Sequence, residues 1–298
     1  MKLLMTLLVV ATVMDLSLTA PPTGRNFGSF IGRTFLKNRA AVPRLGAVPR
    51  VSVQANAAKL DQFLMKTFAT SSITPQGGSG RWAVAKGHRP SVTTNRGGED
   101  MYDVLLVMDS SGSIGSEEFI KAKQFMTDIV SLLPSTISRD NTRIACISFS
   151  EANKIKTEFG FLTHTSKSSV IQAINRITYQ DGSSTHTTQA LQRAKTLLET
   201  TGRRGAQKAL FIATDGRSNG GGNPAVPANQ MKNSDRNDVK IVVVAVSHNV
   251  NVQEVQSIAS APAADHVYYV NTFTEATQVM GVVRHKMMSR GMLNIRRQ

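Results

Sequence analysis

Residues 102–115 read YDVLLVMDSSGSIG, an apolar run that ends in a cluster of small oxygen-bearing side chains. The run is short and almost uninterrupted, which is typical of a strand covered on both faces in a parallel sheet. Three similar runs follow: TRIACISF at 142–149, KALFIAT at 208–214 and KIVVVAV at 240–246. We therefore expect these four runs to be buried strands.

Segments with helical spacing of apolar residues alternate with the runs. Ser116 is the expected cap of one such helix, which Pro134 ends. Its apolar face comprises Phe119, Ala122, Met126, Ile129, Val130 and Leu133. Further helical patterns lie at 190–198 and 273–287, and weaker ones at 167–177 and 251–260. The alternation predicts an α/β domain over residues 99–290, with a doubly wound, mostly parallel central sheet of Rossmann-like type and helices on both faces.

The first hundred residues have a different composition. Residues 1–20, MKLLMTLLVVATVMDLSLTA, have a positive start, an apolar stretch and small residues before Pro21, which favours a cleaved signal peptide over an anchoring helix. Residues 21–98 hold twelve basic residues and one acid, Asp61, and are expected to be a disordered or extended basic arm. Residues 291–298 form a short basic tail.

One part of the arm has a helical pattern. In AAKLDQFLMKTFA, residues 57–69, the apolar side chains of Leu60, Phe63, Leu64 and Phe68 fall on one helical face. The segment is interpreted either as a short helix that docks on another surface or as a transient helix in a loose arm.

The formal net charge is +15. It favours acidic partners, such as sulfated polysaccharide, acidic matrix protein, mineral, membrane or nucleic acid, without choosing among them. Cys146 is the single cysteine, so no internal disulfide can form, and its place in a strand indicates a small buried hydrophobe rather than an intermolecular bridge. The pairs Arg203-Arg204 and Arg296-Arg297 are interpreted as loop arginines or as processing sites.

The oxygen-bearing residues follow predicted strands. Ligands of such sheets bind at the carboxyl ends of the strands, where Asp109, Ser111 and Ser113 follow one run and Asp215 follows another. The loop DGSSTHTT, residues 181–188, opens a predicted helix. All these groups are carboxylates or hydroxyls, and no Cys or His pair has zinc spacing. Such a donor set suits a hard cation such as Mg²⁺.

Three motifs carry a family resemblance. DSSGS at 109–113, STHT at 184–187 and ATDGRSN at 213–219 resemble, in order and spacing, the metal-binding loops of the von Willebrand factor A domain over about residues 101–290. The resemblance implies a metal-ion-dependent adhesion site for Mg²⁺, Mn²⁺ or Ca²⁺, completed by a carboxylate of a partner. It implies direct metal binding by Ser111 and Ser113, binding by Thr185 directly or through water, and roles through water or hydrogen bonds for Asp109 and Asp215.

Some assignments in the threonine loop stay open. Ser183, Ser184, Thr187 or Thr188 could take the place of Thr185. His186 is interpreted as a partner contact or as a plain loop histidine. The connection after 240–246 is too short for the extra helix of collagen-binding integrin domains. The chain is more similar to the A domains of matrilins and non-fibrillar collagens, which are matrix adaptors.

The function expected from these features is that of a secreted extracellular-matrix adaptor. It would bind collagen or another matrix protein through the metal site, and acidic polysaccharide or mineral through residues 21–98. The alternative is a structural component of a fibrous or mineralised matrix that is held by charge. No G-x-S-x-G elbow is present, and no enzymatic activity, nucleic-acid partner or stable membrane insertion is expected.

Overall fold

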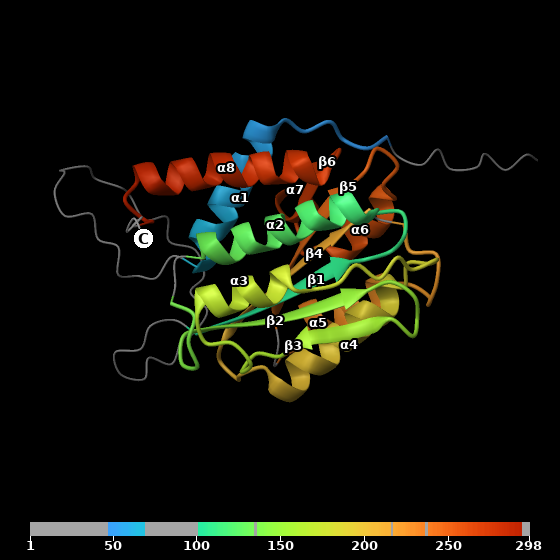
Figure 1. Cartoon of the computed structure of the whole chain (residues 1–298), viewed down its shortest axis with the longest axis horizontal. Helices are drawn as coiled ribbons and strands as arrows, with labels where there is room; N and C mark the ends of the chain where they lie inside the picture. The colour runs from blue at the N-terminus through green and yellow to red at the C-terminus, as the bar shows by residue number, and fades with distance from the viewer. Residues whose placement is uncertain (1–46, 69–100, 134–135, 216, 236–237, 294–298) are drawn as a thin grey trace, which may run out of the picture. The chain divides into compact units, whose positions relative to one another are not determined.

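Six strands form one mixed sheet in the order β3-β2-β1-β4-β5-β6 (Figure 1). The computed structural model describes residues 47–68, 101–133, 136–215, 217–235 and 238–293. The strands are β1 (Tyr102–Asp109), β2 (Thr142–Phe149), β3 (Ile155–Phe159), β4 (Gln207–Thr214), β5 (Val239–Val246) and β6 (Val267–Val270). Only the pairing of β3 with β2 is antiparallel. The predicted doubly wound, mostly parallel fold is therefore confirmed.

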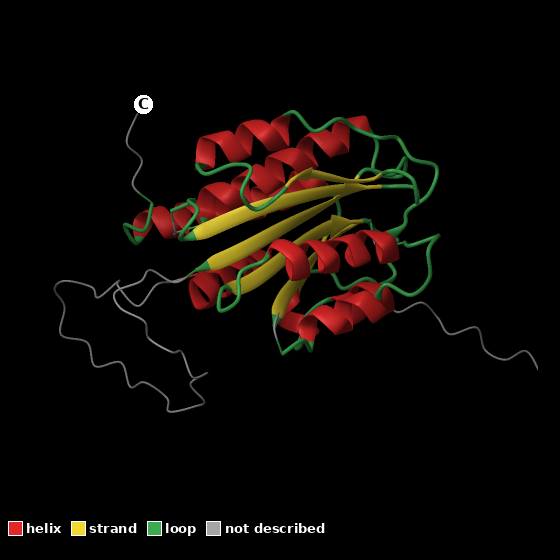
Figure 2. Cartoon of the chain, turned by 90° about the horizontal axis from the view of Figure 1, so that it is seen from below, coloured by secondary structure: helices red, strands yellow, loops and turns green. Residues whose placement is uncertain are grey.

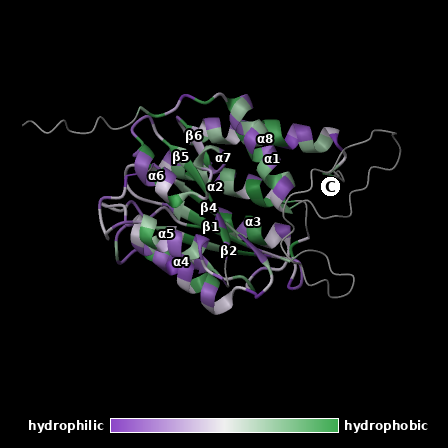
Figure 3. Cartoon of the chain, turned by 180° about the vertical axis from the view of Figure 1, so that it is seen from behind, coloured by the Kyte–Doolittle hydropathy of each residue, from purple (hydrophilic) through white to green (hydrophobic). Residues whose placement is uncertain are grey.

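Helices cover both faces of the sheet (Figure 2). Along β1, Val104, Leu106 and Met108 face one apolar core, and Leu105 and Val107 face the other. The first core is closed by α1 (Val53–Phe68), α2 (Ser116–Leu132), α3 (Lys167–Asn175) and α8 (Phe273–Ser289). The second is closed by α4 (Thr187–Thr201), α5 (Ala225–Lys232) and α6 (Val252–Ile258), and the short α7 (Ala263–His266) precedes β6. Figure 3 shows the strands mostly hydrophobic and the helices of mixed hydropathy, as this layering requires.

The turn after β1 starts α2 without a side-chain cap. Ser116 is the first residue of the helix, and the N-cap position belongs to Gly115, whose φ is 77°. The predicted cap by Ser116 is therefore wrong. Glycine adopts a positive φ without steric cost, so the chain turns from the β1 loop into α2 at this residue.

The segment with the helical pattern in the arm is a docked helix, α1. Leu60, Leu64 and Phe68 are buried in the same core as α2 and α8. Polar contacts hold the helix as well: Asn56 Nδ2 donates to the carbonyl of Tyr269 at 2.8 Å, and Lys59 Nζ donates to the carbonyl of Val267 at 2.8 Å. These carbonyls belong to β6, which is an edge strand, so α1 covers the open edge of the sheet.

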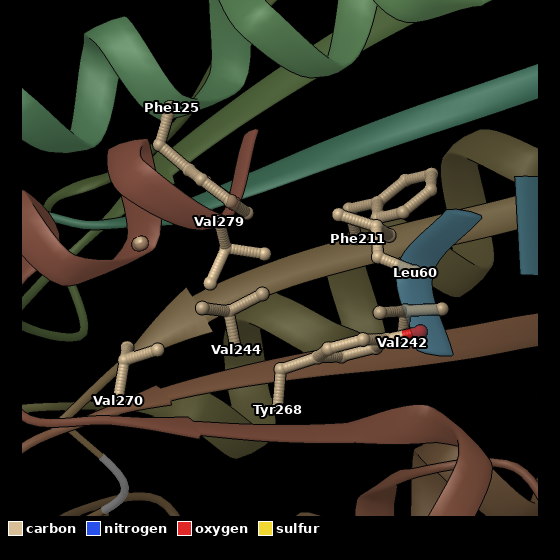
Figure 4. A pocket seen from close by; sticks show the side chains of 9 residues that line it. Leu60, Phe125, Phe211, Val242, Val244, Tyr268, Val270 and Val279 are labelled. Atoms are coloured by element: carbon tan, nitrogen blue, oxygen red, sulfur yellow. The ribbon is translucent and has the colours of Figure 1, made fainter. Parts of the chain in front are cut away.

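A small apolar cavity marks where α1 meets the sheet (Figure 4). It measures about 10 Å³, and Leu60 of α1, Phe125 of α2, Val279 of α8 and Phe211 of β4 are among the residues that border it. Because the space left is so small, α1 fills the core closely and belongs to the same compact unit as the sheet, Leu45–Gln298.

Other predictions for the chain ends stay predictions. Residues 1–46, 69–100 and 294–298 lie outside the described residues, and with them the whole predicted signal peptide and most of the predicted arm and tail. The boundary predicted at residue 99 also falls there. In the described ranges, no helix has the length and apolar character needed to cross a membrane.

Candidate functional site

Asp109 ends β1 at the carboxyl edge of the sheet, where it is almost completely buried. Its Oδ1 accepts hydrogen bonds from the backbone nitrogen of Ser111 at 2.9 Å and from Ser111 Oγ at 2.6 Å. Its Oδ2 accepts a hydrogen bond from Thr214 Oγ1 at 2.8 Å. One carboxylate therefore ties the loop after β1 to the end of β4 and fixes the orientation of the Ser111 hydroxyl.

The two serine hydroxyls of the loop meet beside this carboxylate. Ser111 Oγ lies 3.2 Å from Ser113 Oγ. Ser111 is buried and Ser113 is exposed. The oxygen cluster thus begins inside the protein and opens to solvent at Ser113.

The loop that contains Tyr179 and Gly182 contacts the backbone of the oxygen cluster. The backbone nitrogen of Gly112 donates to the carbonyl of Gly182 at 2.7 Å, and Tyr179 Oη donates to the carbonyl of Ser111 at 3.1 Å. A Cβ on Gly112 would lie 3.2 Å from the Gly182 carbonyl oxygen, so this close approach favours glycine. Sequence reasoning missed Tyr179 as a support, because a lone tyrosine in a loop carries no motif.

Thr185 comes to the same edge from the start of α4. It is buried, and its backbone nitrogen donates to Asn219 Oδ1 at 2.6 Å. The Asn219 nitrogen donates back to the Thr185 carbonyl at 3.1 Å. This reciprocal pair joins the threonine loop to the loop that carries Asp215, so all three loops of the predicted site are connected.

Asp215 supplies a second carboxylate directly after β4. Its Oδ1 is buried and has no hydrogen-bond partner among the described residues. Burial, together with the charge of Asp215, raises the pKa of Asp109 to about 6, although hydrogen bonds from Ser111 and Thr214 oppose the rise. No described Lys, Arg or His forms an ion pair with either carboxylate. The edge therefore holds uncompensated negative charge.

These residues fit a divalent cation. A buried carboxylate oxygen without a partner is costly, and a bound cation would satisfy it. The donor set consists of carboxylate and hydroxyl oxygens, which suits a hard metal. Within the described ranges, no group of three or more His, Cys, Asp and Glu side chains could hold a metal ion, so a site here depends on its hydroxyls.

The other candidates in the threonine loop have distinct surroundings. Ser183 is directed to Glu151, whose Oε1 accepts from its backbone nitrogen at 2.8 Å and from its Oγ at 3.1 Å. Thr187 and Thr188 lie in the first turn of α4, with buried hydroxyls that have no partner among the described residues. His186 is half-buried at the N-cap of α4, with Nδ1 3.2 Å from Gln189 Oε1.

A hollow of about 410 Å³ lies beside the oxygen cluster. Ser113 and Asp215 form the side nearest to the cluster, and Arg217, His248 and Asn271 are among the residues of the remaining wall. A partner segment that reached Ser113 would have room in this hollow, next to an exposed arginine.

Comparisons with known proteins agree with this geometry. The sequence profile of the von Willebrand factor type A domain matches residues 103–281. The chain is 36% identical over 149 residues to von Willebrand factor A domain-containing protein 2 of Xenopus laevis, covering 49% of this chain and 18% of that protein. It is 31% identical over 181 residues to matrilin-3 of Gallus gallus, covering 57% of this chain and 37% of matrilin-3.

A solved structure extends the comparison to the metal site. Proximal thread matrix protein 1 from the mussel byssus, solved with a zinc-occupied MIDAS motif, matches with a TM-score of 0.55 and 26% identity, covering 62% of this chain and 45% of that one. The chain thus spans less than half the length of the relatives named here. With its fold, its three connected loops and the profile match in agreement, the chain belongs to the von Willebrand factor type A domain family and is similar to the matrilins within it.

Proposed function

We propose that this protein is a secreted extracellular-matrix adaptor that binds a matrix protein, such as a collagen, through a divalent cation at the carboxyl edge of its sheet. The observation that carries the proposal is the unpartnered, buried Oδ1 of Asp215 beside the connected cluster of Asp109, Ser111 and Ser113. The similarity to matrix proteins, one with a zinc-occupied MIDAS motif, supports it.

In this proposal each residue has a separate role. Ser111, Ser113 and Thr185 offer hydroxyl ligands to Mg²⁺, Mn²⁺ or Ca²⁺. Asp109 orients Ser111 through its Oδ1, and Asp215 contributes charge. The bound cation supplies a Lewis-acidic position for one carboxylate oxygen of the partner. Because only Ser113 of the two serines is exposed, the partner approaches from its side.

Two further elements complete the proposal. The half-buried His186 lies in the threonine loop, next to Thr185, and is proposed to contact the partner. Residues 21–98, with their twelve basic residues, are proposed to bind acidic polysaccharide or mineral. No catalytic role is proposed for any residue; the Ser111 hydroxyl donates to Asp109 and lies beside the Ser113 hydroxyl, an arrangement that presents oxygen ligands.

Metal binding is tested first, by thermal unfolding of the full chain. Mg²⁺, Mn²⁺, Ca²⁺ and Zn²⁺ are added singly to protein stripped with EDTA, for the wild type and for Asp109→Ala. A cation that raises the midpoint of the wild type alone supports the site. A wild-type midpoint that is the same with each cation as in EDTA would contradict the site. Ser113→Ala should also lose the cation effect. Its control is Ser166→Ala, which removes the N-cap hydroxyl of α3: it should lower the midpoint in EDTA but keep the rise that the cation produces.

Partner binding is tested next, on immobilised collagens and matrix extracts. We expect binding of the wild type in the activating cation, and loss of binding both in EDTA and with Asp109→Ala. Binding that ignored both changes would refute a metal-dependent adaptor.

A charge-held structural component is the second candidate function. The net charge of +15 and the similarity to a thread matrix protein favour it. In that case, assembly with matrix extracts would be lost in moderate salt, which screens exposed charges within about 10 Å at ~0.1 M, and chelation would have no effect.

A further inference from the structure

Basic residues gather at the end of the sheet opposite the oxygen cluster. Asp103, near the start of β1, is paired in register with Arg143 of β2 on one side and with Lys208 of β4 on the other. Arg139 lies just before β2, and Arg203 and Arg204 lie just before β4. This end of the sheet therefore carries five basic residues and two acidic ones, Asp103 and Asp140.

Two of the five basic side chains are fully used inside the fold. Arg203 forms an ion pair with the buried Asp103 at 2.8 Å, and its guanidinium also donates to the carbonyls of Asp140 and Asn141, each at 2.6 Å. Lys208 is buried, and its Nζ donates to the carbonyl of Arg203 at 2.7 Å. These contacts hold the loops together and leave neither group available to a ligand.

The other three basic residues form what we call the arginine face: Arg139, Arg143 and Arg204. Arg139 and Arg204 are exposed, and Arg143 is partly exposed. Arg143 Nε donates to the carbonyl of Arg139 at 2.7 Å, which places the two arginines side by side. No ion pair joins any of the three to a carboxylate in the described part of the chain.

The charge on this face is incompletely balanced. Burial, followed by the neighbouring charge of Arg203, lowers the pKa of the Arg143 guanidinium. Asp103 and Asp140 oppose this change, and Arg139 adds to it. Asp103 also forms the ion pair with Arg203, so the two carboxylates at this end of the sheet, Asp103 and Asp140, are shared among five basic residues. An external anion bound here would relieve the repulsion between the arginines.

We infer that the arginine face binds the sulfate groups of a sulfated polysaccharide. Guanidinium groups match tetrahedral oxyanions with two parallel donors, and three of them, one at the start of β2 and two on the neighbouring loops, suit a linear chain of anionic groups. A protein partner would instead need an apolar or aromatic centre. Met101 is the single large exposed hydrophobic residue beside these loops in the described ranges. The site is separate from the proposed metal site and from residues 21–98.

The test compares two triple variants of the full chain, with heparin as the probe. The first is Arg139→Gln, Arg143→Gln, Arg204→Gln. The control is Lys156→Gln, Arg176→Gln, Arg193→Gln, which removes the same charge from exposed basic residues that lie outside the arginine face and outside residues 21–98. Both variants keep the whole of residues 21–98, so the basic arm contributes equally to heparin binding in the two proteins.

We expect heparin affinity at 0.15 M salt to fall about tenfold or more in the first variant and less than about threefold in the control, because specific contacts add to general charge. Equal losses would overturn the inference. The inference would also be overturned if the wild type bound desulfated heparin as tightly as heparin, or if the first variant lost as much affinity for poly-glutamate as for heparin. Loss of heparin binding by the wild type in EDTA would overturn it as well. If the triple variant melts at a lower temperature than the wild type, the single variant Arg204→Gln replaces it in the heparin assay, because Arg204 lies in an exposed loop.

Discussion

Replacing Leu64 by Ala tests whether α1 is part of the folded domain. Leu64 is 0% exposed and lies in the core shared by α1, α2 and α8. A fully buried Leu→Ala change costs about 3 kcal/mol, through lost transfer free energy and the cavity left behind. For a domain of this size, 1 kcal/mol shifts the midpoint by roughly 2–4 °C, so we expect a midpoint about 6–12 °C lower.

Helix propensity works against this result, which makes the test sharp. Alanine favours a helix more than leucine does, by a few tenths of a kcal/mol, so an undocked helix would be slightly stabilised by the change. Gln62→Ala is the matched control, because Gln62 is exposed on the opposite face of α1. Its midpoint should stay within about 2 °C of the wild type.

The assay is thermal unfolding of the full chain, followed by circular dichroism and calorimetry. A single transition that moves down with Leu64→Ala and not with Gln62→Ala supports a shared core. If both variants had the same unfolding midpoint as the wild type, α1 would contribute no stability, and the reasoning from burial would be refuted.

Three further predictions concern the site and its surroundings. Asp109, with its pKa raised to about 6 from 3.8, is protonated more readily in the folded than in the unfolded chain. In EDTA, the unfolding free energy of the wild type relative to Asp109→Asn should therefore be highest below pH 4 and fall by up to about 3 kcal/mol as the pH rises to 7, measured by urea titration. A flat difference would contradict the burial of the charge. Gly182→Ala should destabilise the protein by about 1–3 kcal/mol and weaken cation binding, because its Cβ would lie 2.4 Å from the Ser150 side chain; an unchanged melting curve would count against this packing. Cys146 is 0% exposed, and burial raises its thiol pKa, so a thiol reagent should label it only on unfolding; labelling of the native protein would refute its burial.

The positions of the central strands could be predicted from the sequence because each is buried on both faces. β3 gave no such signal: IKTEF carries Lys156 and Glu158, which an edge strand tolerates. Helix α5, AVPANQMK, has a proline inside and was also missed. Local pattern detects continuous burial, but a short edge strand and a two-turn helix depend on what packs against them.

The sequence places the carboxylates of the candidate site at one edge of the sheet, but it does not show which of their oxygens lack hydrogen-bond partners. Parallel strands end at the same edge, so Asp109 and Asp215 could be placed at that edge once both runs were strands; their direct neighbourhood follows from the pairing of β1 with β4. The unpartnered oxygen of Asp215 depends on the path of three loops. The polar contacts of Asn56 and Lys59 with β6 join residues more than 200 positions apart, and no spacing rule reaches that far.

The parallel register of β1 has a mechanical consequence. The strand runs from Asp103, which pairs in register with Arg143 of the arginine face, to the oxygen cluster at Asp109, a span of about 20 Å at roughly 3.3 Å per residue. Partners held at its two ends would pull along the strand axis. Tension would then shear the ladders to β2 and β4 as a whole instead of opening them one hydrogen bond at a time. If both proposed sites were occupied by matrix partners, the domain would resist extension with its central strand.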